Sequence, residues 1–525
     1  MSKARAFVLV GGGQSSVSAA QTLRESGFDG EIIIVGDESH APYQRPPLSK
    51  EYLLGESTLE DIGSVRPAWY ADNNVKLELG RRAVRIDRTS LDVELDDGRA
   101  LKADAVLIAT GGTPRRFPGA DSESILYLRT LDDAGRIRRK LRPGLRVAIV
   151  GAGFIGSELA ACARTLGAEV TLIEAMKTPL ERVLGETIGA VCGSLHRENG
   201  VDLRCGVFIE KIKAAESGAV ITTRDGGTIE ADIVVVGIGI LPNVDLAKAT
   251  EITVGNGIRV DEFCRTTARG IYAAGDVANH YHPLFDCRLR VEHFDNATRQ
   301  GAVAAMNMLG GHTRYDDPHW FWSDQYGHSL QYVGHVSQRD DIVIRGSLEE
   351  RSFVAFYLEK GKVSAAFGLN RGGDISAVKL LLSAGVTVDA KTLRDEDVDL
   401  GSLLDDGAGT QAAADASGRV PADGEFHRAA RSGQVCEGGV RRIVVAGVEL
   451  AVARLNGKVY ALHNLCTHLA CHLSSGKVQN GGLTCLCHGS VFDLATGEPI
   501  NPPASKAVKT YPVRETDGQI YVAVK

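Results

Sequence analysis

The chain has 525 residues, which is too many for one hydrophobic core, so three or four domains are expected. Its net charge of -7 provides no basic surface for nucleic acid, and its longest apolar run, residues 233–241, is far too short to span a membrane. The chain enters a strand without a signal-peptide segment, so we expect a cytoplasmic protein. Ten cysteines in such a chain favour metal or redox chemistry over a disulfide scaffold.

The first predicted unit is a strand at 6–10, a glycine turn at 11–16 and a helix at 17–26. This order brings a pyrophosphate against the amides at the start of a helix. Ser16 stands at the third small position, where Gly or Ala is usual. A second strand ends before Asp37, whose carboxylate can accept hydrogen bonds from a ribose. Because a tight turn without a ligand has the same pattern, this turn alone leaves its role open.

The loop that follows, residues 41–50, gives the turn a specific context. Pro46 and Pro47 stiffen it, and it carries Arg45 and Lys50, two cations that can face a diphosphate and a flavin ring. A solvated basic turn is the alternative, and it fits Arg45 better than Lys50. Over residues 5–403 the chain resembles the NADH-dependent ferredoxin reductases of oxygenase systems, the putidaredoxin reductase family, with apoptosis-inducing factor as a more distant relative.

A second nucleotide site is predicted about 140 residues after the first. A strand at 145–150 leads into a complete G-x-G-x-x-G at 151–156, and the next strand ends at Glu174. A carboxylate there favours the 2′-hydroxyl of NADH and repels the 2′-phosphate of NADPH, although Lys177 is close enough in sequence to complicate that preference. Two such turns in one chain imply that two dinucleotides bind together, FAD and NADH.

The resemblance assigns roles to particular residues. It places Asp276, Arg129 and Phe294 at the FAD and Glu158 at the nicotinamide, where an ordinary exposed helix glutamate is the alternative. Lys50, Glu158 and Phe294 are the catalytic candidates. The cofactor-binding candidates are Gly11, Gly13, Ser15, Asp37, Arg45, Lys50, Ala83, Arg129, Gly151, Gly153, Ile155, Gly156, Glu158, Glu174, Gly239, Asp276 and Phe294. His293, beside the flavin, is predicted to have a packing or hydrogen-bonding role, because hydride transfer needs no acid or base there.

A metal-ligand pattern lies near the end of the chain. Cys466 and His468 form a C-x-H element, and after sixteen residues Cys485 and His488 form a C-x-x-H element. Two thiolates for one iron and two imidazoles for the other are the ligand set of a Rieske [2Fe–2S] centre. A Cys2His2 zinc site is the alternative, but zinc fingers pair like ligands, whereas each element here supplies one Cys and one His.

This segment also resembles the respiratory Rieske protein. The resemblance implies a disulfide between Cys471 and Cys487 and a hydrogen bond from Ser490 to the cluster. Phe492 occupies the position of a tyrosine in that protein, so one hydroxyl donor is missing.

The predicted fold class is α/β, with two Rossmann-like dinucleotide-binding domains, an α+β interface domain and a small all-β Rieske domain. The linker is rich in Ala, Gly, Asp and Ser, and about 20 such residues reach roughly 25 Å. The expected boundaries are 1–114 with 243–318 for FAD, 115–242 for NADH, 319–403 for the interface domain, 404–424 for the linker and 425–525 for the Rieske domain.

These features predict an NADH-dependent flavoprotein reductase that passes electrons from NADH to FAD, to its own cluster and on to a partner oxygenase. That partner would be a Rieske non-haem iron oxygenase or a haem-thiolate monooxygenase, and the chain would be a monomer or homodimer. The alternative is an NADH-sensing regulator like apoptosis-inducing factor. Rapid NADH-dependent reduction of cytochrome c favours the reductase, whereas slow flavin reduction with NADH-driven dimerisation favours the sensor.

Overall fold

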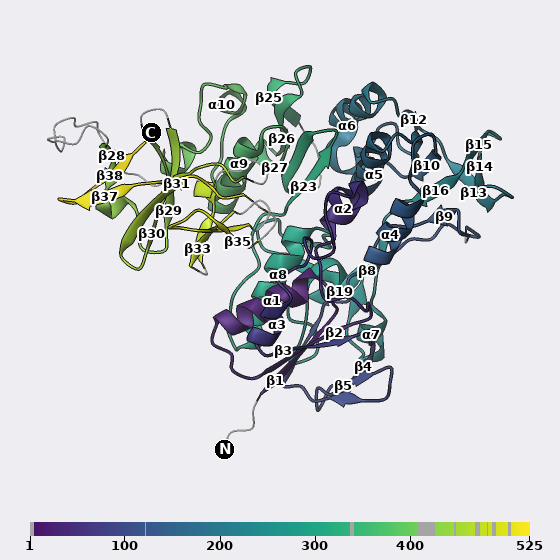
Figure 1. Cartoon of the computed structure of the whole chain (residues 1–525), viewed down its shortest axis with the longest axis horizontal. Helices are drawn as coiled ribbons and strands as arrows, with labels where there is room; N and C mark the ends of the chain where they lie inside the picture. The colour runs from purple at the N-terminus through teal and green to yellow at the C-terminus, as the bar shows by residue number, and fades with distance from the viewer. Residues whose placement is uncertain are drawn as a thin grey trace. The chain divides into compact units, whose positions relative to one another are not determined.

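The computed structural model describes residues 5–120, 122–336, 341–406, 426–445, 448–467, 473–479, 481–485, 490–501, 504 and 506–524. The chain divides into two compact units (Figure 1). Unit 1 runs to residue 319 and includes 323–328, and unit 2 comprises 320–322 and the chain from 329 onward. Among the helices described, none combines the length and the apolar character needed to cross a bilayer.

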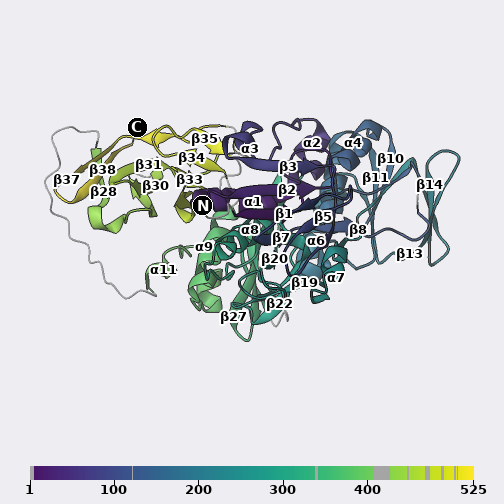
Figure 2. The same cartoon turned by 90° about the horizontal axis from the view of Figure 1, so that it is seen from below.

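The first sheet of unit 1 is parallel and has the order β20-β7-β1-β2-β3. Its strands are β1 (Ala6–Val10), β2 (Glu31–Gly36), β3 (Val75–Leu79), β7 (Ala105–Ile108) and β20 (Ile271–Ala273). Side chains alternate between its faces. Phe7 and Leu9 pack with α1 (Gln14–Glu25) and α8 (Phe294–Met308), which lie side by side (Figure 2). Val8 and Val10 pack on the opposite face, with side chains of β4 (Ala83–Ile86), β5 (Val93–Leu95) and β19 (Gly257–Val260).

Unit 1 also contains shorter strands and helices that lie outside that sheet. The strands are β4 (Ala83–Ile86), β5 (Val93–Leu95), β6 (Ala100–Leu101), β8 (Gly112–Pro114), β17 (Ile240–Pro242), β18 (Val254–Gly255), β19 (Gly257–Val260), β21 (Ala278–His282) and β22 (Cys287–Leu289). The helices are η1 (Pro46–Ser49), α2 (Glu51–Leu54), α3 (Ala68–Asp72), α7 (Asp245–Ala249) and η2 (Gly275–Val277).

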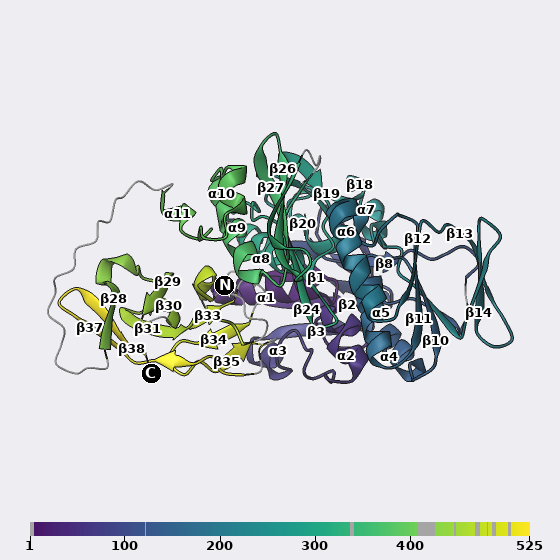
Figure 3. The ribbon, with the colours of Figure 1, turned by 90° about the horizontal axis from the view of Figure 1, so that it is seen from above.

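The second sheet of unit 1 has the order β12-β11-β10-β16-β9 and is also parallel. Its strands are β9 (Ile125–Leu126), β10 (Arg146–Val150), β11 (Glu169–Glu174), β12 (Asp202–Cys205) and β16 (Ile233–Val236). One face packs against α4 (Leu131–Lys140) and α5 (Phe154–Thr165), and α6 (Glu181–Glu198) lies beside α5 (Figure 3). The other face is covered by β13 (Ile209–Ala214), β14 (Ala219–Thr223) and β15 (Thr228–Ala231).

A five-stranded sheet of order β23-β24-β27-β26-β25 follows. Its strands are β23 (Trp320–Gln325), β24 (His328–Gly334), β25 (Asp341–Ser347), β26 (Ser352–Glu359) and β27 (Lys362–Leu369). The helix α9 (Gly372–Ala384) packs against β27, and α10 (Ala390–Arg394) and α11 (Leu403–Asp406) come next. The predicted linker lies almost entirely outside the described residues.

The last part of the chain consists of short antiparallel strands in three sheets, β28-β38-β37, β29-β30-β31-β36 and β32-β33-β34-β35. In chain order they are β28 (Phe426–Arg431), β29 (Val440–Val445), β30 (Val448–Leu455), β31 (Lys458–His463), β32 (Lys477–Gln479), β33 (Gly482–Thr484), β34 (Val491–Asp493), β35 (Pro499–Asn501), β36 (Thr510–Tyr511), β37 (Val513–Thr516) and β38 (Gln519–Ala523), with one-turn helices η3 (Ser432–Gln434) and η4 (Leu473–Ser475). The hairpin turn at Asn456 and Gly457 has positive φ at both residues, as a type I′ turn requires.

Candidate functional site

The first glycine turn leaves the N-terminus of α1 open, and the helix dipole makes this end positive. Gly11 has φ +128°, and a Cβ there would lie 2.1 Å from the carbonyl oxygen of Ala109, so only glycine fits. Gly13 precedes α1, and a Cβ on it would meet nothing within 4 Å. In the described first turn of α1 there is neither a side-chain cap nor an acidic residue. This end of α1 therefore fits a dinucleotide diphosphate.

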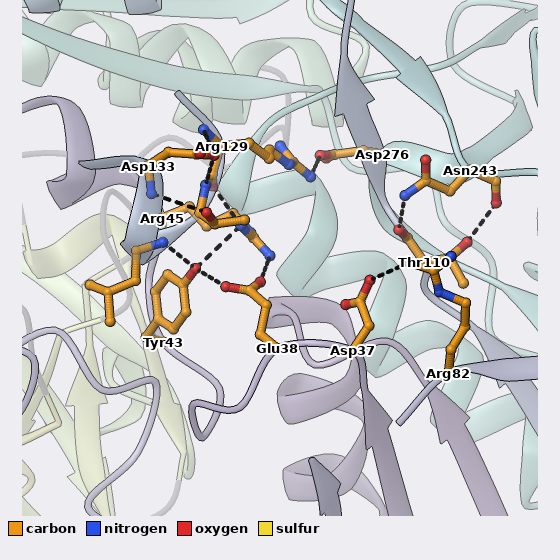
Figure 4. A network of polar contacts seen from close by, with 12 residues as sticks. Asp37, Glu38, Tyr43, Arg45, Arg82, Thr110, Arg129, Asp133, Asn243 and Asp276 are labelled. Carbon is orange, nitrogen blue, oxygen red and sulfur yellow. Dashed lines mark hydrogen bonds and ion pairs between the residues drawn. The ribbon is translucent and has the colours of Figure 1, made fainter. Parts of the chain in front are cut away.

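A network of charges joins the loop at 41–50 to the rest of this region (Figure 4). Arg45 forms an ion pair of 2.7 Å with Glu38 and donates to the carbonyl oxygen of Arg129 at 2.5 Å. Tyr43 donates its hydroxyl to Glu38 at 2.5 Å. Arg129 in turn forms an ion pair of 2.8 Å with Asp276. The structure thus brings together three predicted FAD residues, Arg45, Arg129 and Asp276, from three separate segments.

Other predicted FAD residues lie around the same turn. Ser15 is buried, and its hydroxyl lies 2.5 Å from where a Cβ of Gly275, the neighbour of Asp276, would be. Asp37 directly follows β2, is largely exposed and lies 3.6 Å from Arg82. Ala83 is buried in the core beneath the first sheet. Its role as a cofactor contact therefore stays a prediction.

The second glycine turn has the same construction. Gly151 has φ +97°, and a Cβ on Gly156 would lie 2.0 Å from the carbonyl oxygen of Gly151. A Cβ on Gly153 would meet nothing within 4 Å, and within the described first turn of α5 there is no acidic residue. Glu174, the last residue of β11, accepts a hydrogen bond of 2.7 Å from the amide of Ala152 inside the turn. A carboxylate held at this place fits a ribose diol.

The remaining predicted residues of the second turn are also placed. Ile155 is 45% exposed, which is unusual for isoleucine and leaves an apolar surface beside the turn. Gly239 has φ +94° and open space at its Cβ position. Lys177 is exposed, and its ammonium group pairs with the carboxylate of Glu186 at 3.0 Å rather than with that of Glu174.

Lys50 and Glu158 form a buried ion pair between the two nucleotide regions of unit 1. Lys50 Nζ lies 2.9 Å from Glu158 Oε1, and both side chains are less than 10% exposed. Burial alone would lower the pKa of Lys50, but the charges of Glu158 and Asp324 outweigh it and raise that pKa. Ser323 donates to Glu158 at 2.7 Å, and Ser49 also donates to it. Lys50 therefore keeps its positive charge, and this cation and the two hydroxyls fix the carboxylate of Glu158 in place.

Neighbouring groups argue against thiol or acid–base chemistry here. Cys162 lies one turn after Glu158 in α5, and burial, helped by the charge of Glu158, raises the pKa of its thiol to about 12. It stays protonated at neutral pH and is a poor nucleophile. Burial also lowers the pKa of His293 to about 4, so the ring is neutral, in keeping with the packing role predicted for it. Phe294 is half-buried at the first position of α8.

The cluster ligands follow two strands of the last part of the chain. Cys485 comes directly after β33 and is 0% exposed, and Cys466 follows β31 by three residues and is 2% exposed. The amide of Cys485 donates to the carbonyl of Ser490 at 2.7 Å. His468, His488, Cys471 and Cys487 lie outside the described residues. Two buried thiols on adjacent loops supply the cysteine half of the predicted ligand set.

Ser490 and Phe492 are also fully buried. Ser490 Oγ accepts a hydrogen bond of 2.9 Å from the amide of Ala504. Because that bond uses a lone pair of the oxygen, the hydroxyl proton is available for a second acceptor, such as a cluster sulfur. Phe492 packs in the hydrophobic core.

Three segments match known family models. Residues 5–301 match pyridine nucleotide-disulphide oxidoreductase, residues 320–404 match the reductase C-terminal domain, and residues 425–512 match the Rieske [2Fe-2S] domain. The chain belongs to the pyridine nucleotide-disulphide oxidoreductase family. The predicted fold class, the enzyme class of flavoprotein oxidoreductase and the cofactors FAD, NAD(H) and a [2Fe–2S] cluster are confirmed, and the zinc alternative is set aside.

Individual relatives are ferredoxin reductases of oxygenase systems. The ferredoxin–NAD(+) reductase component of the anthranilate 1,2-dioxygenase system of Burkholderia cepacia is 41% identical over 401 residues, covering 76% of this chain and 99% of that relative. Putidaredoxin reductase of Pseudomonas putida is 38% identical over 405 residues, covering 76% and 96%. The solved covalent putidaredoxin reductase–putidaredoxin complex is similar with a TM-score of 0.75 and 37% identity, covering 77% of this chain and 99% of that one. The predicted resemblance is therefore confirmed.

Some residues of the site were not predicted. The hydroxyls of Ser49 and Ser323 hold Glu158, and the side chain of Gln300 accepts from the amide of Gly275 at 2.8 Å. Asn243 donates to the carbonyl of Thr110 at 2.9 Å (Figure 4). Ser49 lies in the loop singled out in the sequence, but hydroxyls are too common for spacing to reveal such partners.

Proposed function

We propose that this chain carries electrons from NADH through FAD to its own Rieske cluster and on to the oxygenase of a two-component system. The observation that carries the proposal is the presence of a ferredoxin-reductase segment and a Rieske domain in one polypeptide. The relatives named above serve oxygenase systems, which supports an oxygenase as acceptor and favours a reductase over an NADH sensor. We further propose a cytoplasmic monomer or homodimer with the domain boundaries predicted above.

The roles proposed for individual residues follow from their positions. When bound, FAD takes a hydride from NADH and returns the electrons one at a time. Arg45, Arg129 and Asp276 would hold FAD at the first turn, and Glu174 would hold the ribose of NADH at the second. The Lys50–Glu158 pair joins the two regions and would fix the nicotinamide against the flavin.

An anaerobic NADH titration of the purified chain, followed by visible and EPR spectra, tests the proposal. FAD stores two electrons and the cluster one, so complete reduction should need about 1.5 NADH per chain. The EPR signal of the reduced cluster should grow along with flavin bleaching. A cluster that stays oxidised under excess NADH would contradict the proposed circuit.

Glu174 should set the preference for NADH. The variant Glu174→Gln keeps an oxygen for the amide of Ala152 but loses the charge that opposes a 2′-phosphate. We expect the ratio of kcat/KM for NADH over NADPH to fall at least roughly tenfold, because the variant relieves a repulsion between like charges and each 1.4 kcal/mol or so is a factor of ten. Glu186→Gln, which removes an exposed carboxylate paired with Lys177, is the matched control and should leave the ratio unchanged.

Ser490 should raise the reduction potential of the cluster. A donor to cluster sulfur stabilises the reduced, more negative form. If the hydroxyl contributes about 1.4 kcal/mol, Ser490→Ala should lower the midpoint by about 60 mV in protein-film voltammetry. Thr516→Ala removes an exposed hydroxyl on β37, in another sheet, and should leave the midpoint where it is. An equal midpoint for Ser490→Ala and the wild type would refute the hydrogen bond.

A further inference from the structure

Three histidines gather in the interior of unit 1, apart from the nucleotide turns. His280 and His282 lie on β21, and His319 ends the segment that leads from α8 toward β23. One ring nitrogen from each lies within 4.8 Å of the other two. His280 and His282 are 0% exposed and His319 is 4% exposed. The predicted function assigns no role to these residues.

His280 is the residue that packing alone leaves unexplained. Among the described residues, neither ring nitrogen of His280 has a hydrogen-bond partner. A buried polar atom without a partner destabilises the folded state, and such groups are rare in folded proteins. A neutral imidazole carries a proton on one ring nitrogen and a lone pair on the other, and a metal ion can accept that lone pair. A ligand within the cluster would satisfy it.

The hydrogen bonds of the other two histidines orient their rings as metal ligands are oriented. His282 Nε2 lies 3.0 Å from the carbonyl oxygen of Asp317 and must donate to it, which leaves the lone pair on Nδ1. Tyr315 donates its hydroxyl to Asn296 at 2.9 Å, so its oxygen can accept from His319 Nδ1 at 3.4 Å, which leaves the lone pair of His319 on Nε2. Metal-bound histidines have such partners on the other ring nitrogen.

We propose that His280, His282 and His319 bind one zinc ion. Neutral imidazoles suit zinc, which takes four ligands in a tetrahedron, and a water molecule would complete the set. At a zinc–nitrogen distance of about 2.0–2.1 Å, ligand nitrogens lie roughly 3.3 Å apart. Small side-chain rotations would therefore draw the three rings together by up to roughly 1.5 Å when the ion binds.

The position of the site assigns it a structural role. The strand β21 directly follows η2, which contains the FAD residue Asp276. His319 closes a segment that is anchored at Asp317 by an ion pair of 2.7 Å with Arg299 of α8. An ion at the three histidines would join β21 to this segment and stiffen the backbone next to the flavin site. The inference stands on different residues from the proposed electron path and can fail without affecting it.

Zinc content tests the proposal in the full-length chain with FAD and cluster in place. Each protein is washed with a mild chelator, incubated with one equivalent of zinc chloride, desalted and measured for zinc, iron and FAD. We expect about one zinc per FAD in the wild type and in His312→Gln, which changes an exposed histidine of the same unit. His280→Phe fills the same space without a ligand and should retain none, and all three proteins should keep about two irons per FAD.

Two results would overturn the proposal: a wild type that takes up no zinc, or a His280→Phe variant that takes up as much as the wild type. His319→Gln, which can still hydrogen-bond Tyr315, serves as a second zinc-free variant if His280→Phe does not fold. Zinc X-ray absorption should give nitrogen neighbours at about 2.0–2.1 Å and no sulfur at about 2.3 Å. Sulfur neighbours would place the zinc at the cysteines and also overturn the proposal.

Discussion

Replacing Cys466 with Ala is expected to abolish electron delivery to protein acceptors while leaving reduction of the flavin intact. Cys466 is buried and is the proposed source of one of the two thiolates on a single iron, so we expect that the variant cannot hold the cluster. NADH-dependent reduction of cytochrome c should fall at least about 100-fold. The loss of a residue that only hydrogen-bonds a metal ligand already lowers metal affinity or activity about 10–100-fold. Stopped-flow bleaching of the flavin by NADH should remain within about twofold of the wild type, because the nucleotide turns are untouched.

The Rieske domain contains a second cysteine that serves as a matched control for this experiment. Cys436 is exposed and lies outside both ligand elements, so Cys436→Ser should keep the cluster and full cytochrome c reduction. In the Cys466 variant, complete reduction should require about one NADH per chain in place of about 1.5, because the cluster electron is lost. If cytochrome c reduction by that variant matched the wild type, electrons would leave directly from the flavin, and the cluster would have no place in the path.

Features fixed by neighbouring residues could be predicted from the sequence. The two glycine turns were located because the close approaches at Gly11 and Gly156 exclude any side chain, and such demands appear as a local pattern. The hairpin turns at Asn456 and Asp517 make the same kind of local demand, since both positions adopt a positive φ that Asn and Asp tolerate. The cysteine and histidine spacing identified the cluster because iron ligands must come from two short loops.

Contacts between distant segments could not be predicted in this way. Arg129 and Asp276 are separated by 147 residues, and only the resemblance to reductases placed both at the flavin. The sequence contained only part of the information needed to predict the histidine cluster. His280 and His282 are two apart on a strand and so share a face, but His319 comes from another segment and gave no reason to be paired with them.

The contacts of Glu158 also join segments that are distant in the sequence, so the local sequence pattern could not predict them. Its partners Lys50, Ser49 and Ser323 come from two distant loops, and a glutamate in the first turns of a helix is usually exposed. In the structure Glu158 is 4% exposed. A carboxylate can be buried only where a cation and donors converge on it, and that convergence is a property of the fold.

Replacing Lys50 with Met is expected to impair both stability and hydride transfer. The substitution leaves the carboxylate of Glu158 buried with two hydroxyls and no cation. Removing one partner of a buried ion pair costs about 3–5 kcal/mol, so thermal unfolding should shift to a clearly lower temperature. The rate of flavin reduction by NADH should fall on the order of 100-fold, since small displacements of reacting groups are costly. Lys177→Met, which breaks an exposed pair, should cost less than about 1 kcal/mol and leave the rate unchanged.

The double variant Lys50→Met with Glu158→Gln separates positioning from structural support. Neutralising the carboxylate removes the unpaired buried charge, and the amide can still accept from Ser323, so most of the lost stability should return. The rate of flavin reduction should stay low, because neither charge remains to fix the nicotinamide. A double variant that regained the rate together with the stability would mean that the pair only holds the fold. Continued slow reduction in a stable protein would mean that Lys50 and Glu158 position the reacting groups.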